Sequence, residues 1–138
     1  MTRSEAREHV MRILYEIEFR PKENIQELAE IYLELVPEEP ANLAERDFIL
    51  REVNGTMEHV AELDEAIAAC VHGWSLNRLS KVDLAILRLA LYEIRYEEDI
   101  PERVSINEAV ELAKKYSQEA ARGFVNGILA NFAKSEGK

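Results

Sequence analysis

Apolar side chains recur along most of the chain at the three- and four-residue spacing of amphipathic helices. The clearest example is a stripe near the C-terminus formed by Ala121, Phe124, Val125, Ile128, Leu129 and Phe132. No stretch shows the strict alternation of apolar and polar residues that a half-buried strand requires. The pattern therefore predicts an all-α chain, with helices near residues 3–19, 24–36, 42–71, 80–97, 105–117 and 118–133.

Four of the predicted helices begin at a residue that can cap them, followed three positions later by an acid. The pairs are Thr2 and Glu5, Asn24 and Glu27, Asn42 and Glu45, and Ser105 and Glu108. The cap side chain can accept a hydrogen bond from a free amide of the first turn, and the acid can accept one from the amide of the cap residue. We expect Ser105 to be the best defined cap, because Pro101 precedes it and a clean amphipathic run follows.

Two Asn-Gly pairs, Asn54-Gly55 and Asn126-Gly127, lie inside predicted helices, although this dipeptide usually marks a hairpin turn. The apolar residues around Asn126 do not alternate, which argues against a hairpin. A glycine inside a helix costs about 1 kcal/mol relative to alanine, so a structural reason is expected, such as the close approach of another backbone. At Gly55 the alternative is a break of the 42–71 helix into two shorter helices.

Residues 84–94 are apolar nearly all round, which predicts a central helix that is buried on most sides. Arg88 is the exception within this segment. A buried guanidinium without a partner is very costly, so we expect Arg88 to be a structural residue held by a carboxylate or by carbonyl groups at a helix end. The alternative is a functional contact made by the exposed tip of its side chain.

Composition limits the functions that this chain can have. Its 138 residues are 47% hydrophobic and 32% charged, which is enough for one domain with a core. The formal net charge of −10 argues against sequence-independent nucleic-acid binding, which relies on cations that displace counterions from phosphate. Any RNA contact then needs a local basic patch or a partner that supplies positive charge.

The sequence offers little for catalysis or metal binding. Cys70 is the only cysteine, and with His72 it supplies too few ligands for zinc. There is no glycine-rich phosphate loop and no nucleophile elbow, so we expect neither an enzyme nor a metal site. The single cysteine, the charged N-terminus and the lack of an apolar run of about 20 residues predict a cytoplasmic protein that does not enter a membrane.

Basic residues and aromatic rings gather in two parts of the chain, the first helix and the last two helices. The first group is Arg3, Arg7, Arg12 and Tyr15, and the second is Lys114, Lys115, Arg122 and Phe124. Such groups suit single-stranded RNA, because guanidinium groups pair with phosphate while rings stack on unpaired bases. The alternative is a set of ordinary surface cations beside core aromatic residues.

Ordered blocks in the second half of the chain resemble a known family. They are WSLNRLS at 74–80, VD at 82–83, ILRLALYE at 86–93, IP at 100–101, INEAVELAK at 106–114 and FVNGIL at 124–129, with ARE at 6–8 and LY at 14–15 in the first half. These blocks are similar to the NusB transcription antitermination family. The resemblance implies a NusB-like bundle of about six or seven helices, in which residues 1–138 form one domain of two packed subdomains, 1–72 and 73–138.

The resemblance also implies a function. The family binds boxA RNA of nascent ribosomal RNA transcripts together with the ribosomal protein NusE, and the complex helps RNA polymerase to pass terminators. It has no catalytic activity and no cofactor. Carried over by position, Arg7, Tyr15, Asp83 and Phe124 would lie in or beside the RNA surface, and Arg3 is a looser match.

Asp83 would orient amino groups of bases or neighbouring basic side chains rather than touch phosphate. From the pattern of basic residues we add Lys114 and Arg122 to the predicted RNA surface. In the family reading, Gly127 lets a neighbouring helix approach closely and Asn126 exchanges hydrogen bonds with backbone at that crossing. Phe124 is assigned to the core by the apolar stripe and to a partly exposed position by the family.

This chain also departs from the family pattern. The arginine run that often precedes the first helix is reduced to Arg3 and Arg7, and Gly123 stands where a lysine is common. We therefore expect weak RNA affinity without NusE. The alternative function is a protein-binding helical module with a weakened RNA face, and a homodimer that masks this face also stays open. A third reading, the N-terminal domain of an RNA cytosine methyltransferase, would require a longer chain.

Overall fold

The computed structural model describes residues 1–71 and 79–136, and within these ranges it contains seven helices and no strand. The helices are α1 (Arg3–Phe19), α2 (Ile25–Leu35), α3 (Leu43–Glu58), α4 (Val60–Cys70), α5 (Lys81–Tyr96), α6 (Glu102–Tyr116) and α7 (Ala121–Ser135). The prediction of an all-α bundle is confirmed. The WSLNR part of the first family block, at 74–78, lies outside the described residues, as does His72.

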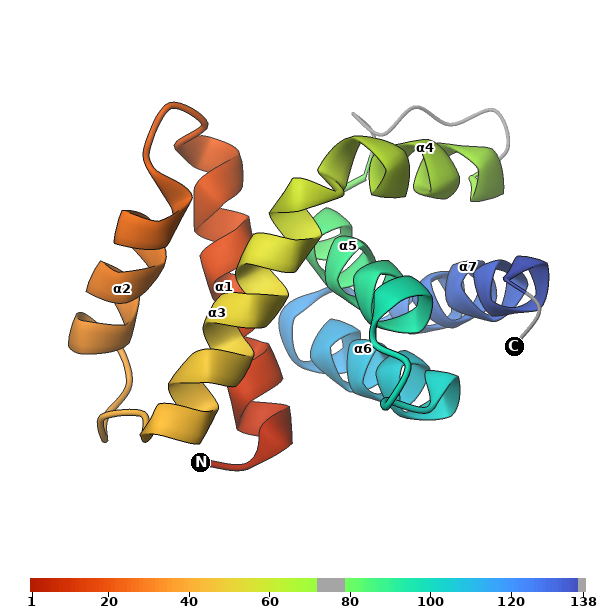
Figure 1. Ribbon diagram of the computed structural model, residues 1–138. Coiled ribbons are helices and arrows are strands. Elements are labelled where there is room, and N and C mark those ends of the chain that lie inside the picture. The colour runs from red at the N-terminus through yellow and green to blue at the C-terminus, as the bar shows by residue number, and fades with distance from the viewer. Residues whose placement is uncertain (72–78, 137–138) are drawn as a thin grey trace.

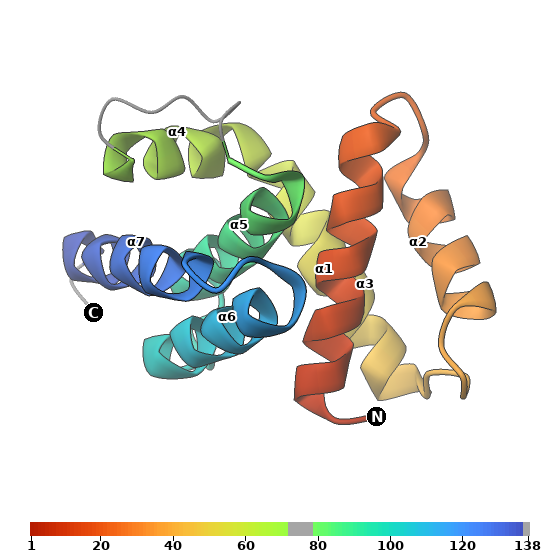
Figure 2. The same cartoon turned by 180° about the vertical axis from the view of Figure 1, so that it is seen from behind.

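The central helix is α5, as the sequence predicts. Every residue from Leu84 to Ile94 is buried, and α5 packs against α1, α3, α4, α6 and α7. In Figures 1 and 2, α1, α2 and α3 lie on one side of α5, whereas α4, α6 and α7 lie on the other. The subdomain boundary at residue 72 stays a prediction, although α4 packs on α5 and α7 rather than continuing the α1–α3 group.

The predicted 42–71 helix is two helices, so this prediction is wrong. It ends at Glu58 and begins again at Val60, and His59 between them departs from helical geometry with φ −106° and ψ 13°. The change of direction lets α3 pack on α1 while α4 packs on α5 and α7 (Figure 1). Apolar residues continue across the break, which is why spacing alone predicts one helix. The break lies at His59 and not at Gly55.

Three of the four predicted caps are confirmed. Thr2 and Asn42 form full capping boxes, and the Asn24 side chain accepts from the amide of Glu27. The prediction for Ser105 is wrong, because α6 begins at Glu102 directly after Pro101. A proline without an amide hydrogen suits a helix start. Ser105 therefore lies in the second turn, where it is buried and donates to a carboxylate of α5.

The two helical glycines differ in their surroundings. A Cβ atom at Gly55 would overlap the ring and hydroxyl of Tyr92, so this glycine does allow a close approach, by a side chain of α5. At Gly127 a Cβ atom would meet nothing within 4 Å, and both Asn126 and Gly127 are exposed. The prediction that these two residues form a close helix crossing is wrong, because they lie on the face of α7 opposite its apolar stripe.

Arg88 is buried and held by carboxylates, as the sequence predicts. Its side chain donates through Nε and Nη2 to both carboxylate oxygens of Asp64 on α4, each at 2.8 Å, and through Nη1 to Glu18 on α1 at 2.7 Å. Only 8% of Arg88 is exposed. The guanidinium thus ties α1 and α4 to the central helix.

Candidate nucleic-acid interface

A surface cavity of about 600 Å³ lies where the ends of four structural segments meet. Its lining includes Cys70 and Val71 at the end of α4, Leu79, Ser80 and Asp83 around the start of α5, Ser117, Gln118 and Ala120 in the connection from α6 to α7, and Ala121 and Phe124 on α7. The fold therefore brings Asp83 and Phe124 together, although 40 positions separate them in the sequence. Most of the lining is apolar, with a few polar groups among it.

Asp83 is held in the first turn of α5. Its amide donates to the hydroxyl of Ser80, which caps the helix, and its carboxylate accepts a hydrogen bond from Ser117 at 2.7 Å. The side chain is half-buried and lines the cavity. A carboxylate fixed in this way can accept hydrogen bonds from base amino groups and repels phosphate.

Phe124 is 37% exposed, unlike its neighbour Val125, which is fully buried. Other large apolar side chains of the described residues are also exposed, among them Leu35 and Leu43, but of these exposed side chains only Phe124 lines the cavity. Of its two predicted roles, partial exposure agrees with the family and not with the core. A partly exposed ring beside a cavity can stack on an unpaired base.

The outer face of α1 carries a second group of rings. Tyr15 is half-buried and meets the exposed Phe19 edge to face, with ring centroids 5.0 Å apart. Arg12 is exposed on the same face, and its guanidinium lies 5.9 Å from the ring centroid of Tyr32. The connection from α6 to α7, which lines part of the cavity, lies next to α1 in both Figures 1 and 2.

Further contacts join α1 to this region. Lys115 near the end of α6 pairs with Glu8 of α1, and Lys81 at the start of α5 donates to Glu18 at 3.2 Å. Arg12 belongs to the first basic group of the sequence analysis but was not carried over to the predicted RNA surface, and Phe19 was not named at all. The spacing of 12, 15 and 19 along one helix face could have identified Phe19.

The prediction that Arg7 lies at the surface is wrong. Arg7 is 5% exposed, and its Nε lies 2.9 and 3.2 Å from the two carboxylate oxygens of Glu93. Arg3 is exposed, but its guanidinium stacks 4.1 Å from the ring centroid of Phe48 on α3. Both arginines therefore approach Phe48, and they do not form a cationic surface together with Tyr15.

Lys114 and Arg122 are separated by the fold. Lys114 is exposed and borders a hollow of about 250 Å³ between α1 and α6, together with Ser4 and Glu8. Arg122 lies in the first turn of α7, two residues before Phe124, and its Nη2 is 3.6 Å from Glu119. Arg122 directly follows the cavity residue Ala121, whereas Lys114 borders a different hollow.

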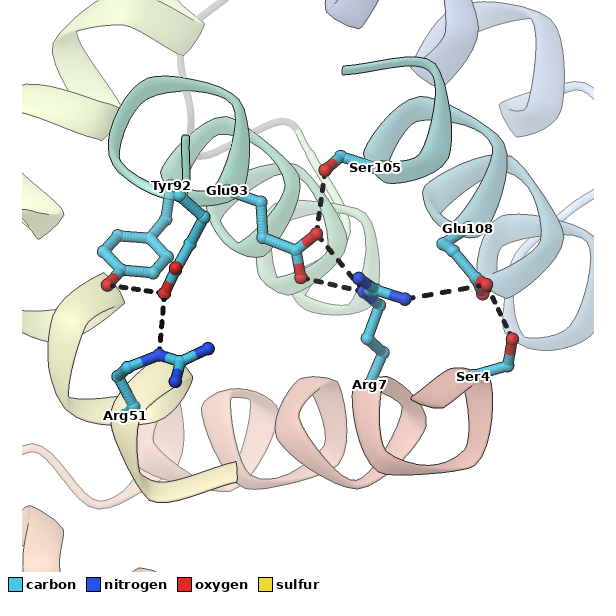
Figure 3. A network of polar contacts seen from close by, with 8 residues as sticks. Ser4, Arg7, Arg51, Tyr92, Glu93, Ser105 and Glu108 are labelled. Carbon is cyan, nitrogen blue, oxygen red and sulfur yellow. Dashed lines mark hydrogen bonds and ion pairs between the residues drawn. The ribbon is translucent and has the colours of Figure 1, made fainter. Parts of the chain in front are cut away.

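A buried polar network fixes α1 against α5 and α6 (Figure 3). Glu93 of α5 accepts from Arg7 and, at 2.8 Å, from the hydroxyl of Ser105 on α6. Glu108 of α6 accepts from Ser4 at 2.6 Å and lies 3.7 Å from Nη1 of Arg7. The network sets the position of α1, and therefore of its outer face, relative to the rest of the molecule.

The described residues contain no group of three His, Cys, Asp or Glu side chains placed to hold a metal ion. In the same part of the chain, no helix is both long enough and apolar enough to span a membrane. Burial raises the pKa of the Cys70 thiol, so this cavity residue is protonated at neutral pH.

The chain matches a known protein family and individual known proteins. Residues 4–134 match the model of the NusB family. The transcription antitermination protein NusB of Agathobacter rectalis is 52% identical over 135 residues, which cover 96% of this chain and 100% of that protein. The protein of the same name from Ruminiclostridium cellulolyticum is 45% identical over 136 residues, covering 99% of this chain and 91% of that protein.

Solved structures agree with the sequence comparisons. The structure of NusB from T. maritima superposes with a TM-score of 0.90 at 37% identity and covers 100% of this chain and 94% of that one. A crystal structure of antitermination factors NusB and NusE in complex with dsRNA gives a TM-score of 0.85 at 28% identity, with 98% and 99% of the two chains covered. From the family match, the sequence identities and the shared fold, this chain belongs to the NusB family.

Proposed function

We propose that this chain is a non-catalytic transcription antitermination factor that binds boxA RNA of nascent ribosomal RNA transcripts together with NusE. Its relatives are named transcription antitermination protein, and a similar NusB chain is bound to NusE and dsRNA. The observation that carries the proposal is the cavity that joins Asp83 to the exposed ring of Phe124. The action on RNA polymerase would be indirect, through the assembled complex, and would take place in the cytoplasm.

The proposed RNA surface differs from the one that the sequence predicts. Phe124 and Tyr15 would stack on unpaired bases, and Asp83 would accept hydrogen bonds from base amino groups. Arg12 and Arg122 would approach phosphates along the path between them. Arg7 is left out, because its guanidinium is buried against Glu93.

A partner would have to supply much of the positive charge. The chain has a net charge of −10, and two cations near the proposed surface, Lys115 and Arg122, already have acidic partners in Glu8 and Glu119. We therefore propose that NusE provides most of the phosphate contacts. RNA affinity should rise on addition of NusE and should then fall more steeply with salt.

The non-catalytic role also agrees with the chemistry of the cavity. Its titratable groups are Asp83 and Cys70, and the carboxylate accepts from Ser117 while the thiol is protonated. Neither is paired with a base in the way that an activated nucleophile requires. The burial of Arg7 favours the second candidate function, a protein-binding module with a weakened RNA face, and the experiment must separate the two.

The test is retention of RNA on immobilised NusE in the presence of this protein. We expect boxA RNA to be retained and a scrambled RNA to be lost. Phe124→Ala and Asp83→Asn should each weaken retention, since loss of one stacked base costs about 1–3 kcal/mol. Leu43→Ala and Asp99→Asn, at exposed sites outside the proposed surface, are the matched controls.

Equal retention of both RNAs would favour the protein-binding module instead. Filter binding at two salt concentrations, with and without NusE, tests the role of the partner. Tight binding by this protein alone, with no steeper salt dependence after NusE is added, would contradict it.

A further inference from the structure

A second carboxylate, Glu52, lies in the interior on α3, which packs against the α1 and α5 helices of the Arg7–Glu93 pair, and both members of that pair act on it. Glu52 is 0% exposed, and neither of its carboxylate oxygens has a hydrogen-bond partner among the described residues. One turn further along α3, the hydroxyl of Thr56 is also buried and lacks a partner in the described part of the chain. A buried carboxylate without a hydrogen bond is costly when ionised, so its charge state has to be explained.

The charges around Arg7 do not balance if the carboxylates of both Glu52 and Glu93 are ionised. Glu93 is 1% exposed and already accepts from Arg7 and Ser105. Arg7 directs its Nε to both oxygens of Glu93, and its Nη1 faces Glu108. One buried guanidinium would then face two buried carboxylates, leaving a net negative charge in the interior. A proton on Glu52 removes this excess.

The titratable groups that face Glu52 come from three helices. They are Arg7 on α1, Arg51 on α3, and Tyr92, Glu93 and Glu97 on α5. Arg51 does not compensate Glu52, because its Nε pairs with Glu97 at 2.9 Å. The helix α2 meets α3 elsewhere, at Asn54 and Arg46. Burial, and next the carboxylate of Glu93, raise the pKa of Glu52 far above its ordinary value.

We propose that Glu52 is a neutral carboxylic acid that shares its proton with Glu93, and that this makes the contact of α1 and α3 with α5 sensitive to pH. The hydroxyl of protonated Glu52 would donate to Glu93, while Arg7 neutralises the charge that remains. Loss of the proton to solvent would leave two like charges side by side in the interior. The cluster of Glu52, Glu93 and Arg7, here called the Glu52 cluster, would then be strained and the three helices would separate more easily.

The proposal predicts a specific pH dependence of stability. In the folded protein Glu52 keeps a proton that it loses in the unfolded chain above the ordinary pKa of glutamate. Raising the pH therefore favours the unfolded chain. For one proton, the unfolding equilibrium constant rises about tenfold per pH unit. Glu52→Gln keeps a donor toward Glu93 but has no proton to lose, so it should remove this contribution.

The experiment is urea unfolding of the whole chain at several values between about pH 6 and 9. We expect the ratio of the unfolding constants of the wild type and Glu52→Gln to rise about tenfold per pH unit. Glu58→Gln, at an exposed site on the same helix, should follow the wild type. Parallel curves for the wild type and Glu52→Gln would overturn the proposal.

Infrared spectroscopy provides a measurement that does not depend on a variant. Wild-type protein with isotope-labelled glutamate should show the carbonyl stretch of a neutral carboxylic acid at pH 7.5, and this band should disappear on unfolding. Its absence from the folded protein would overturn the proposal, even if Glu52→Gln fails to fold.

Discussion

Two buried arginines, Arg88 and Arg7, tie opposite ends of α1 to the rest of the molecule. The carboxylates that they contact differ in solvent exposure and in charge balance. Arg88 contacts Glu18 and Asp64, whose side chains are each 24% exposed. Lys81 also pairs with Glu18, so this Arg88 cluster (Arg88, Glu18, Asp64 and Lys81) has two positive and two negative charges. The carboxylates of the Glu52 cluster are 0% and 1% exposed and have one guanidinium between them.

The difference in exposure shows two ways in which a helical bundle can stabilise buried charge. At the Arg88 cluster water still reaches the carboxylates, so part of their hydration is kept and charge balance is complete. At the Glu52 cluster hydration is lost, and the balance needs a proton as well as the arginine. Partner removal should therefore cost more at the second cluster than at the first, because breaking a buried pair leaves an uncompensated charge.

The largest effect is expected for Arg7→Met. The substitution leaves Glu93 buried without its guanidinium, and breaking such a pair costs about 3–5 kcal/mol in free energy of unfolding. Urea unfolding at pH 7 measures this loss. Arg3→Met on the same helix is the control, and we expect it to change stability by no more than about 1 kcal/mol, the value of an exposed cation–π contact.

If Arg7→Met were as stable as Arg3→Met and weakened RNA binding instead, the family-based assignment of Arg7 to the RNA surface would be restored.

A smaller loss is expected for Arg88→Met. Charged hydrogen bonds are worth about 1.5–3 kcal/mol, and here the carboxylates left behind can regain contact with water. The same urea experiment gives the value. A larger loss of unfolding free energy than for Arg7→Met would mean that burial of the acidic partner does not determine the cost of removing the arginine. The contrast drawn between the Arg88 and Glu52 clusters would then not hold.

The two clusters also show what the sequence can predict. Arg88 lies in a segment that is otherwise apolar nearly all round, so its burial and its need for a carboxylate partner could be predicted from the sequence. Arg7 lies in the polar stretch ARE, and whether another helix covers it depends on tertiary packing. A signal was nevertheless present, because Glu93 lies in the same apolar segment as Arg88 and needs a cation of its own.

Other features depended on packing in the same way. The spacing of Ile49 and Val53 places Glu52 on the inner face of α3, but spacing does not give its protonation state. The break at His59 leaves the apolar pattern intact, so it follows only from the different neighbours of α3 and α4. The placement of Asp83 and Phe124 at one surface was implied only by the resemblance to a family, because no local sequence pattern connects positions so far apart.

Packing near the Glu52 cluster should also be less tolerant than packing on the far side of α7. Gly55→Ala forces a Cβ atom into Tyr92, and overpacking of this kind costs about 1–3 kcal/mol. Gly127→Ala meets nothing and gains helix propensity, so it should stabilise by up to about 1 kcal/mol. Thermal unfolding of the two variants provides the measurement. A destabilised Gly127→Ala would restore the close crossing that the sequence predicted there.

The smallest effect is expected at Glu18 of the Arg88 cluster. Its contribution to stability should depend on pH in the opposite direction to that of Glu52. Burial by itself would raise the pKa of Glu18, but hydrogen bonds and charge from Arg88 outweigh burial, and the net shift is downward. The unfolded chain then binds the proton more readily, so stability is lost as the pH falls from the ordinary glutamate value through the lowered pKa. Because Glu18 is partly exposed, the loss should be about 1 kcal/mol or less.

Glu18→Gln should flatten the acid side of the stability curve, whereas Glu52→Gln flattens the neutral and alkaline side. If unfolding measured between about pH 3 and 6 showed a steeper acid loss for Glu18→Gln than for the wild type, the two clusters would respond to protons in the same direction, and the contrast between a hydrated and a dehydrated ion cluster would not hold.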